Sequence, residues 1–380
     1  MKKQYIYTPG PTPVPFEVAA AQARMVHHRT DEFGECLARV LDGLKFVFQT
    51  DNEVMLLTSS GTGAMEAAVA NCFSPGDRVI VFSGGKFGER LVEISNCFGL
   101  EAVVVEYAWG DCADPADLEK ALAENPGARG VFLTQSETST GVVNDVEAFG
   151  RIVLGTDALF LLDAISGLGA VDLKTDDWGV DLCVGGSQKG LMTPPGLAFV
   201  AVSDAAWKAA AKATLPSYYF NLEVARKAQS ASPPQTPYTP AITLVQALDV
   251  ALGMLREEGL GAVFARHELF ARATQAAVKA MGLRFVASDL SRAFVCTSVR
   301  APEGLKSGDL VKLLRSEYGV SIAGGQGKLK GKIFRLGHVG YFDMFDVIAQ
   351  VAAVEVGLKR LGHPVEIGCG VTAALEVLAG

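Results

Sequence analysis

Short apolar runs alternate with helical patterns along the first two-thirds of the chain. The runs are rich in valine, isoleucine, leucine and phenylalanine, and stretches between them have helical character. Because near-continuous apolar runs are typical of strands buried on both faces, the pattern predicts an α/β fold in which helices cover both sides of a mostly parallel sheet. We expect strands at 53–58, 78–82, 102–105, 130–134, 159–162 and 197–202, and helices at 64–72 and 87–98.

A change in composition ends this alternation. Four prolines lie within 229–240, and because proline disrupts regular structure, this stretch is predicted to be an extended loop or arm. Helical patterns follow at 243–258 and 261–281, and strand-like runs at 294–299 and 332–335 indicate a compact second domain. The predicted division is an N-terminal arm at 1–20, a large cofactor-binding domain at 21–260 and a small C-terminal α+β domain at 261–380.

Composition and charge narrow the class of protein. The 380 residues are 49% hydrophobic and 20% charged, which is ordinary for a globular protein. The net charge is −8 and no lysine–arginine cluster interrupts it, which argues against binding to nucleic acid or an anionic membrane. No apolar run approaches the roughly 18 residues of a membrane span, and no secretory signal precedes the first prolines. Seven cysteines without a C-x-x-C pair predict free thiols, no zinc site and a cytoplasmic location.

One lysine lies where α/β sheets bind their ligands. Lys189 follows a strand-like run that ends in the small residues Gly185, Gly186 and Ser187. Open α/β sheets bind ligands at the carboxyl ends of their strands, so this lysine is a candidate for cofactor chemistry. The alternative is an ordinary surface lysine in a glycine-rich turn.

An aspartate and a hydroxyl-rich turn complete the pattern. Asp163 ends another buried run, where a carboxylate is costly unless it is paired, and a pyridoxal ring needs such a partner at its nitrogen. Ser60, Gly61 and Thr62 lead from a strand into a helix, which suits a phosphate, although neither P-loop nor G-x-G-x-x-G spacing is met. Each feature alone could be a plain helix cap. Their order within one α/β domain predicts a pyridoxal-phosphate site.

With these residues in place, the chain resembles the class V aminotransferases of fold type I, in particular their alanine–glyoxylate and serine–pyruvate branch. The matching stretches run in order along nearly the whole sequence. They are Thr8-Pro9-Gly10-Pro11, Ser60-Gly61-Thr62 with Glu66-Ala67-Ala68, Gly85-Lys86-Phe87-Gly88-Glu89-Arg90, Glu137-Thr138-Ser139-Thr140-Gly141, Asp163-Ala164-Ile165-Ser166, Gly186-Ser187-Gln188-Lys189, Pro194-Pro195-Gly196 and Phe334-Arg335-Leu336-Gly337-His338.

The resemblance implies a mostly parallel seven-stranded sheet, a smaller C-terminal domain and transamination between alanine or serine and glyoxylate or pyruvate. It implies that Lys189 holds the cofactor as a Schiff base and moves the α-proton, while Asp163 pairs with the pyridinium. The remaining roles that it implies are phosphate binding by Ser60, Gly61, Thr62 and Gln188, a position near the ring oxygen for Thr138, stacking on the ring by Phe87, binding of the substrate α-carboxylate by Arg335, and approach to the substrate by Gly10 and the segment around His28.

The same resemblance implies a homodimer with active sites at the subunit interface. Tyr238 and Thr239, in the proline-rich stretch, would contribute to the phosphate site of the partner subunit. For Arg335 the alternative is a structural ion pair, and for His28 it is an ordinary capped or buried histidine.

Four other functions share this fold. A cysteine desulfurase needs a reactive cysteine on the loop before the arginine strand, and the loop 321–329 has none. A phosphonate transaminase or an amino-acid lyase, and a catalytically silent accessory subunit with a pyridoxal-phosphate fold, stay open as alternatives.

Overall fold

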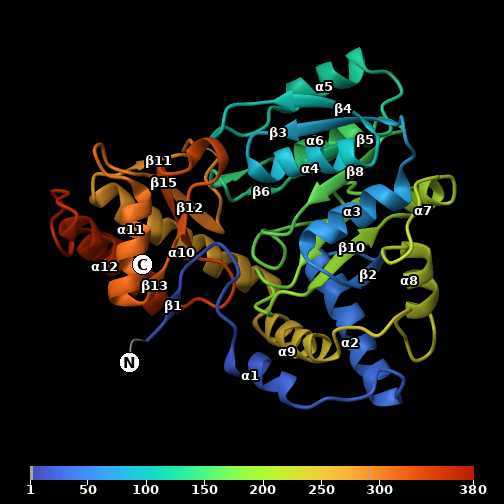
Figure 1. Cartoon of the computed structure of the whole chain (residues 1–380), viewed down its shortest axis with the longest axis horizontal. Helices are drawn as coiled ribbons and strands as arrows, with labels where there is room; N and C mark the ends of the chain where they lie inside the picture. The colour runs from blue at the N-terminus through green and yellow to red at the C-terminus, as the bar shows by residue number, and fades with distance from the viewer. Residues whose placement is uncertain (1–2, 290) are drawn as a thin grey trace.

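The computed structural model of the chain describes residues 3–289 and 291–380, so the first two residues of the predicted N-terminal arm lie outside it. Its larger sheet has seven strands in the order β2-β10-β9-β8-β5-β3-β4 (Figure 1). All neighbouring pairs in it are parallel except those of β10, which is antiparallel to both β2 and β9. The predicted seven-stranded, mostly parallel sheet is therefore confirmed. Its strands are β2 (Glu53–Thr58), β3 (Arg78–Ser83), β4 (Glu101–Glu106), β5 (Gly130–Thr134), β8 (Leu159–Asp163), β9 (Leu182–Gly186) and β10 (Leu197–Val202).

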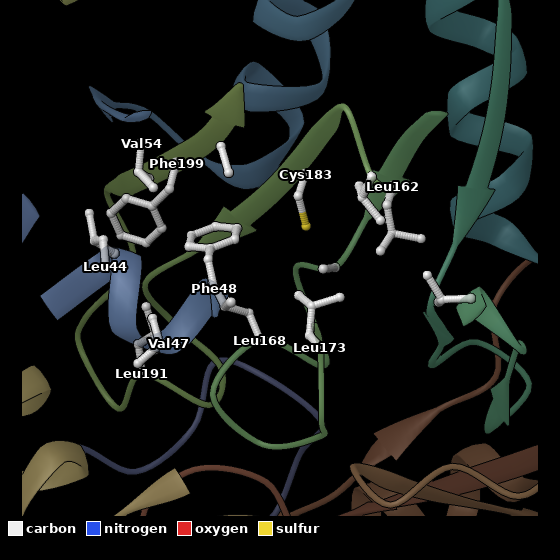
Figure 2. Close-up of a cluster of buried hydrophobic side chains, with 14 of the residues drawn as sticks. Leu44, Val47, Phe48, Val54, Leu162, Leu168, Leu173, Cys183, Leu191 and Phe199 are labelled. Carbon is white, nitrogen blue, oxygen red and sulfur yellow. The ribbon is translucent and has the colours of Figure 1, made fainter. Parts of the chain in front are cut away.

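The central strands of this sheet are buried on both faces, as their apolar runs predicted. Leu161 and Leu162 are neighbours in β8, yet they belong to two different apolar clusters, because successive side chains of a strand point to opposite faces. On one face, Phe199 and Cys183 pack with Phe48 at the end of α2 (Figure 2). The sheet is thus the middle layer of a three-layer domain.

Helices cover both faces of the sheet. The helices α2 (Asp31–Phe48), α5 (Pro115–Glu124), α6 (Val146–Val153) and α9 (Ile242–Glu258) contribute to one apolar cluster, and α3 (Gly61–Cys72), α4 (Lys86–Cys97), α7 (Asp204–Ala210) and α8 (Leu222–Gln229) contribute to the other. The helix α3 begins at Gly61, three residues before the predicted start, so that its amino end directly follows the turn after β2. Residues 231–241 contain no helix or strand, as their prolines predicted.

The C-terminal part forms a separate antiparallel sheet with its own apolar core. The expected strand at 294–299 is shifted to Cys296–Arg300, and the one at 332–335 extends to Gly337. In the described residues the strand order is β11 (Arg284–Phe285), β12 (Cys296–Arg300), β15 (Ile333–Gly337) and β14 (Ala323–Gly324), and the helices are α10 (Leu260–Ala280), α11 (Ser307–Leu313), α12 (Met344–Arg360) and α13 (Cys369–Leu378).

The N-terminal segment connects the two parts of the molecule (Figure 1). The strand β1 (Tyr5–Ile6) pairs with β13 (Val320–Ser321), and α1 (Phe16–Ala20) packs against α9. Between them, Thr12 donates from its backbone N–H to the carbonyl of Gln188 and from its hydroxyl to that of Lys189. The segment therefore runs from β13 in the C-terminal part to the loop after β9. The domain boundaries themselves stay a prediction.

The cysteines and the possible membrane spans are the remaining features that the sequence predictions concern. Four cysteines are buried, but Cys97 and Cys112 are exposed, so not all of the thiols lie in apolar surroundings. Of the helices that the structure describes, none is long and apolar enough to cross a membrane.

Candidate active site

A cavity of about 210 Å³ lies at the carboxyl edge of the large sheet. It forms there because β2, β8 and β9 each end at this edge and are followed by polar loops. Side chains or backbone from the N-terminal segment, the start of α3 and the start of α4 complete its walls. Eight of the residues singled out in the sequence line it: Gly10, Ser60, Gly61, Thr62, Phe87, Asp163, Gln188 and Lys189.

The Lys189 amine is held by the N-terminal segment. Its Nζ donates to the carbonyl oxygen of Pro9 at 2.6 Å. A Cβ on Gly10 would lie 2.4 Å from the Lys189 side chain, and the φ of Gly10 is +132°, so only glycine fits here. The pKa of Lys189 is lowered to about 8, mainly by burial; the charges of Arg335 and Arg90 act in the same direction, and Cys296 and Asp163 in the opposite one. Part of this lysine is therefore neutral near neutral pH.

Asp163 is a buried carboxylate at the end of β8. It is 3% exposed, and its Oδ1 accepts from the backbone N–H of Ile165 at 3.0 Å. Burial raises its pKa to about 6. Among the described residues, no lysine, arginine or histidine forms a salt bridge with it. A cationic ring nitrogen would therefore find an unpaired carboxylate here.

The start of α3 offers donors to an anion. Ser60 is the N-cap residue, but its hydroxyl makes no capping hydrogen bond, and the first N–H groups of a helix have no intrahelical acceptor. A Cβ on Gly61 would lie 2.4 Å from Cδ1 of Ile165, so any larger residue here would displace the Ile165 side chain. Gln188 lines the same cavity, and its buried Oε1 has no hydrogen-bond partner. The free N–H groups and hydroxyls at the start of α3, and the unpaired carboxylate of Asp163 in the same cavity as Lys189, fit pyridoxal phosphate: the first would hold its phosphate and the others its ring.

A buried glutamate that the sequence reasoning did not single out holds the start of α4. Oε2 of Glu137 accepts from the backbone N–H groups of Phe87 and Gly88, at 2.9 and 3.1 Å. Its Oε1 accepts from the hydroxyl of Ser139 at 2.5 Å. Burial raises its pKa, and these hydrogen bonds oppose that effect. Glu137 thus fixes the position of Phe87, and its place in the Glu-Thr-Ser-Thr-Gly stretch that carries part of the resemblance was the available signal.

Arg335 lies on β15 close enough to Lys189 that its charge lowers the pKa of that lysine, although it does not line the cavity. Its Nε donates to the carbonyl of Gly324 at 2.9 Å and its Nη1 to that of Thr138 at 3.0 Å. Only 6% of the residue is exposed, and burial lowers the pKa of the guanidinium. Within residues 3–289 and 291–380, no carboxylate forms a salt bridge with it, so the alternative of a structural ion pair has no partner here.

Arg90 was also missed in the sequence. It lines the cavity, its Nη1 donates to the hydroxyl of Thr62 at 3.3 Å, and its guanidinium lies 5.0 Å from the centre of the Phe87 ring. The signal was the spacing of three residues between Phe87 and Arg90, which places both on one face of α4.

Besides Arg335, four residues of the sequence prediction do not line this cavity. Thr138 is buried, and its carbonyl accepts a hydrogen bond from Nη1 of Arg335. Tyr238 stacks on Tyr219 and donates its hydroxyl to the Tyr218 carbonyl, and with Thr239 it lines a different hollow. His28 lies beside His27, outside the cavity lining. The roles of these residues stay predictions.

Fold and cavity together define an α/β enzyme of the pyridoxal-phosphate type. The family model for "Aminotransferase class-V" matches residues 16–332. The chain is 43% identical to the "Soluble hydrogenase, small subunit" of a Synechococcus species over 99% of both chains, and 36% identical to the L-aspartate–glyoxylate aminotransferase of Paracoccus denitrificans over 98% of this chain and 95% of the other. The solved structure of ureidoglycine–glyoxylate aminotransferase from Bacillus subtilis aligns over 100% of this chain and 99% of the other, with a TM-score of 0.96 and 30% identity. The chain belongs to the class V aminotransferases, which depend on pyridoxal phosphate.

Proposed function

We propose that the protein transfers the amino group of a small amino acid, alanine or serine, to a small 2-oxo acid, glyoxylate or pyruvate. The observation that carries the proposal is a cavity lined by a lysine with a lowered pKa and by a buried unpaired carboxylate. Close by, the buried guanidinium of Arg335 has no salt bridge among the described residues, and its charge acts on that lysine. Two relatives, one compared by sequence and one by structure, are named for glyoxylate as the acceptor, which supports this oxo acid.

In this proposal Lys189 links covalently to the cofactor, Asp163 faces its ring nitrogen, and Phe87 stacks on the ring. Ser60, Gly61, Thr62 and Gln188 surround the phosphate. When bound, pyridoxal phosphate supplies an electron sink for the charge left at Cα of the substrate. The carboxylate of Asp163 is buried and has no salt bridge, so its negative charge would stabilise a proton on the ring nitrogen.

Lys189 then acts as the acid and base. Its pKa of about 8 lets the free amine take the α-proton near neutral pH and return it to the neighbouring carbon. The Pro9 carbonyl accepts one N–H of this amine, which leaves the nitrogen lone pair free for the proton. The N-terminal segment therefore orients the amine while it is released from the cofactor.

Arg335 binds the substrate carboxylate in this proposal. Two of its N–H groups are used by backbone carbonyls, which fix the plane of the guanidinium, and the others remain for a carboxylate. A charged acceptor would also recover the solvation that the buried guanidinium has lost. Gly10 and Pro11 close the cavity beside Lys189, which favours a small substrate side chain.

We further propose a cytoplasmic homodimer in which Tyr238 and Thr239 serve the phosphate site of the partner subunit. Tyr218 is 84% and Tyr219 47% exposed, and both stack with Tyr238 outside this chain's own cavity. Such an exposed aromatic cluster suits contact with a second copy. His28 lies in the neighbouring segment, where Arg29 donates to the Thr236 carbonyl at 2.9 Å, so it would approach the same interface. Light scattering of the purified protein tests the dimer, and a monomer that turns over at full rate contradicts it.

The test of function is a panel of amino donors and oxo-acid acceptors with the purified protein. We expect visible absorbance from bound cofactor, conversion to the amine form with alanine or serine, and return with glyoxylate or pyruvate. A protein that binds the cofactor but turns over no donor would instead support an accessory role, to which the name of the Synechococcus relative also points. Release of a β-substituent or of phosphonate product would indicate a lyase or a phosphonate transaminase.

A further inference from the structure

The proposed site has to neutralise two anions. The α-carboxylate of the substrate has Arg335, while the phosphate of the cofactor carries about −1.5 to −2 charges by analogy with phosphorylated side chains. The phosphate residues proposed above, Ser60, Gly61, Thr62 and Gln188, offer only hydroxyl and amide donors. A helix amino end adds about half a positive charge, which leaves most of the phosphate charge without a partner in this chain.

Arg90 is a cation of the same cavity, where its charge lowers the pKa of Asp163 without forming a salt bridge with it. Among the described residues, no aspartate or glutamate forms a salt bridge with its guanidinium. Lys86, on the same helix, is by contrast bound to Glu89 at 3.0 Å and to Glu93 at 3.2 Å. Arg90 therefore brings an uncommitted positive charge to the cavity wall.

The position of this guanidinium points to the phosphate end of the site. Its hydrogen bond to the hydroxyl of Thr62, at 3.3 Å, places it beside the second residue of α3. Its contact with Phe87 keeps the arginine against the ring that would stack on the cofactor. The guanidinium thus lies between the first turn of α3 and the aromatic wall.

We propose that Arg90 is the cation that binds the cofactor phosphate, next to Thr62. This inference rests on the proposed cofactor site. A guanidinium could bind the distal carboxylate of a dicarboxylic donor such as aspartate by the same chemistry, but the bond to Thr62 at the start of α3 favours the phosphate. Each anion of the reaction then has one guanidinium, Arg335 for the substrate and Arg90 for the cofactor.

The test compares Arg90→Gln and Arg90→Lys in the full-length protein, with Lys86→Gln as a control that removes one positive charge from the same helix. The dissociation constants of pyridoxal phosphate and of pyridoxal, which lacks the phosphate, are measured by titration of the cofactor-free protein. Inorganic phosphate is added as a competitor. We expect Arg90→Gln to weaken pyridoxal phosphate about 10- to 100-fold, as for loss of a charge-assisted hydrogen bond, and to leave pyridoxal unchanged. Competition by phosphate should weaken in parallel, Arg90→Lys should lie in between, and Lys86→Gln should resemble the wild type.

Other results would overturn the inference. An equal loss of affinity for both aldehydes would give Arg90 a structural role. Unchanged cofactor affinity with a selective loss of aspartate turnover, relative to alanine, would assign it to a substrate carboxylate, and no change in any of these would remove it from the site. Wild-type protein that binds no pyridoxal phosphate would instead contradict the proposed function itself. Circular dichroism shows whether Arg90→Gln is folded, and if it is not, Arg90→Lys decides between the outcomes.

Discussion

The amine of Lys189 and the carbonyl oxygen of Pro9 lie 2.6 Å apart, although 180 positions separate the two residues in the sequence. The N-terminal segment is held on the C-terminal part by the pairing of β1 with β13, and Thr12 fixes it to the lysine loop. The segment that carries Pro9 and Gly10 is thus packed directly on Lys189.

Gly10→Ala should impair catalysis. Its new Cβ would lie 2.4 Å from the Lys189 side chain, and the residue would keep a φ of +132°. Strain of this kind costs of order 1–3 kcal/mol, and the lysine has to move. We expect turnover to fall about 100-fold while the folded content stays that of the wild type. Gly127→Ala is a matched control, because Gly127 has a φ of +86° and nothing within 4 Å of the added Cβ. Similar losses in both variants would show that backbone strain, rather than contact with Lys189, explains the effect.

The lowered pKa of Lys189 predicts an unusual labelling profile. In protein freed of cofactor, the rate of reaction of Lys189 with an amine reagent follows its neutral fraction. Since the pKa is about 8, the rate should rise about tenfold per pH unit below 8 and level off above it, whereas labelling of a lysine with the ordinary value of about 10.4 keeps rising. Peptide mapping after short pulses measures this. A Lys189 rate that still climbs between pH 9 and 10 would contradict the prediction.

Replacement of Lys189 by alanine should abolish both transamination and the visible absorbance of bound cofactor, with the fold retained. Borohydride reduction of the wild-type holoenzyme followed by peptide mapping gives an independent readout. The pyridoxyl label is expected on Lys189. A label on Lys86, which lies at the start of α4 near the cavity, would show that the reactive lysine is assigned to the wrong residue.

Asp163→Asn should affect catalysis and stability in opposite directions. An amide cannot stabilise the proton on the ring nitrogen, so turnover should fall by roughly 10²- to 10³-fold while the cofactor still binds. Without cofactor, the folded state raises the pKa of Asp163 from 3.8 to about 6, so it binds more protons than the unfolded state. Wild-type stability should therefore fall as pH rises from about 4 to 6 and stay low above 6, by about 3 kcal/mol at most. Urea unfolding at pH 4 and pH 8 should show that the asparagine variant lacks this loss.

Arg335→Lys should separate substrate binding from cofactor binding. Lysine keeps the charge but cannot form two parallel bonds to a carboxylate. We expect normal cofactor absorbance, and apparent affinities for alanine and glyoxylate weakened about 10- to 100-fold, as for loss of one charge-assisted bond. An amine without an α-carboxylate should be affected far less. Equal losses for both kinds of amine would place Arg335 in a structural role.

The fold class and the most local parts of the site could be predicted from the sequence alone. Buried strands are read from runs of apolar residues, and the residue after such a run lies at the carboxyl edge of the sheet. Asp163, Lys189 and the turn Ser60–Thr62 could therefore be found from their places beside these runs. An apolar run carries no information on strand direction, however, so the antiparallel orientation of β10 emerged only from the structure.

The contacts between residues far apart in the chain became visible only in the tertiary structure. The hydrogen bonds of Glu137 to Phe87, of Arg90 to Thr62 and of Lys189 to Pro9 each join separate elements. A local pattern specifies which face of a helix or strand is buried, but not which distant element meets it, because that depends on how all of the layers pack at once. Lys189 was therefore visible in the sequence through its place beside an apolar run, and Phe87 through the resemblance. The contacts of Lys189 with Pro9 and of Phe87 with Glu137, and the place of Arg90 in the cavity, became visible only in the fold.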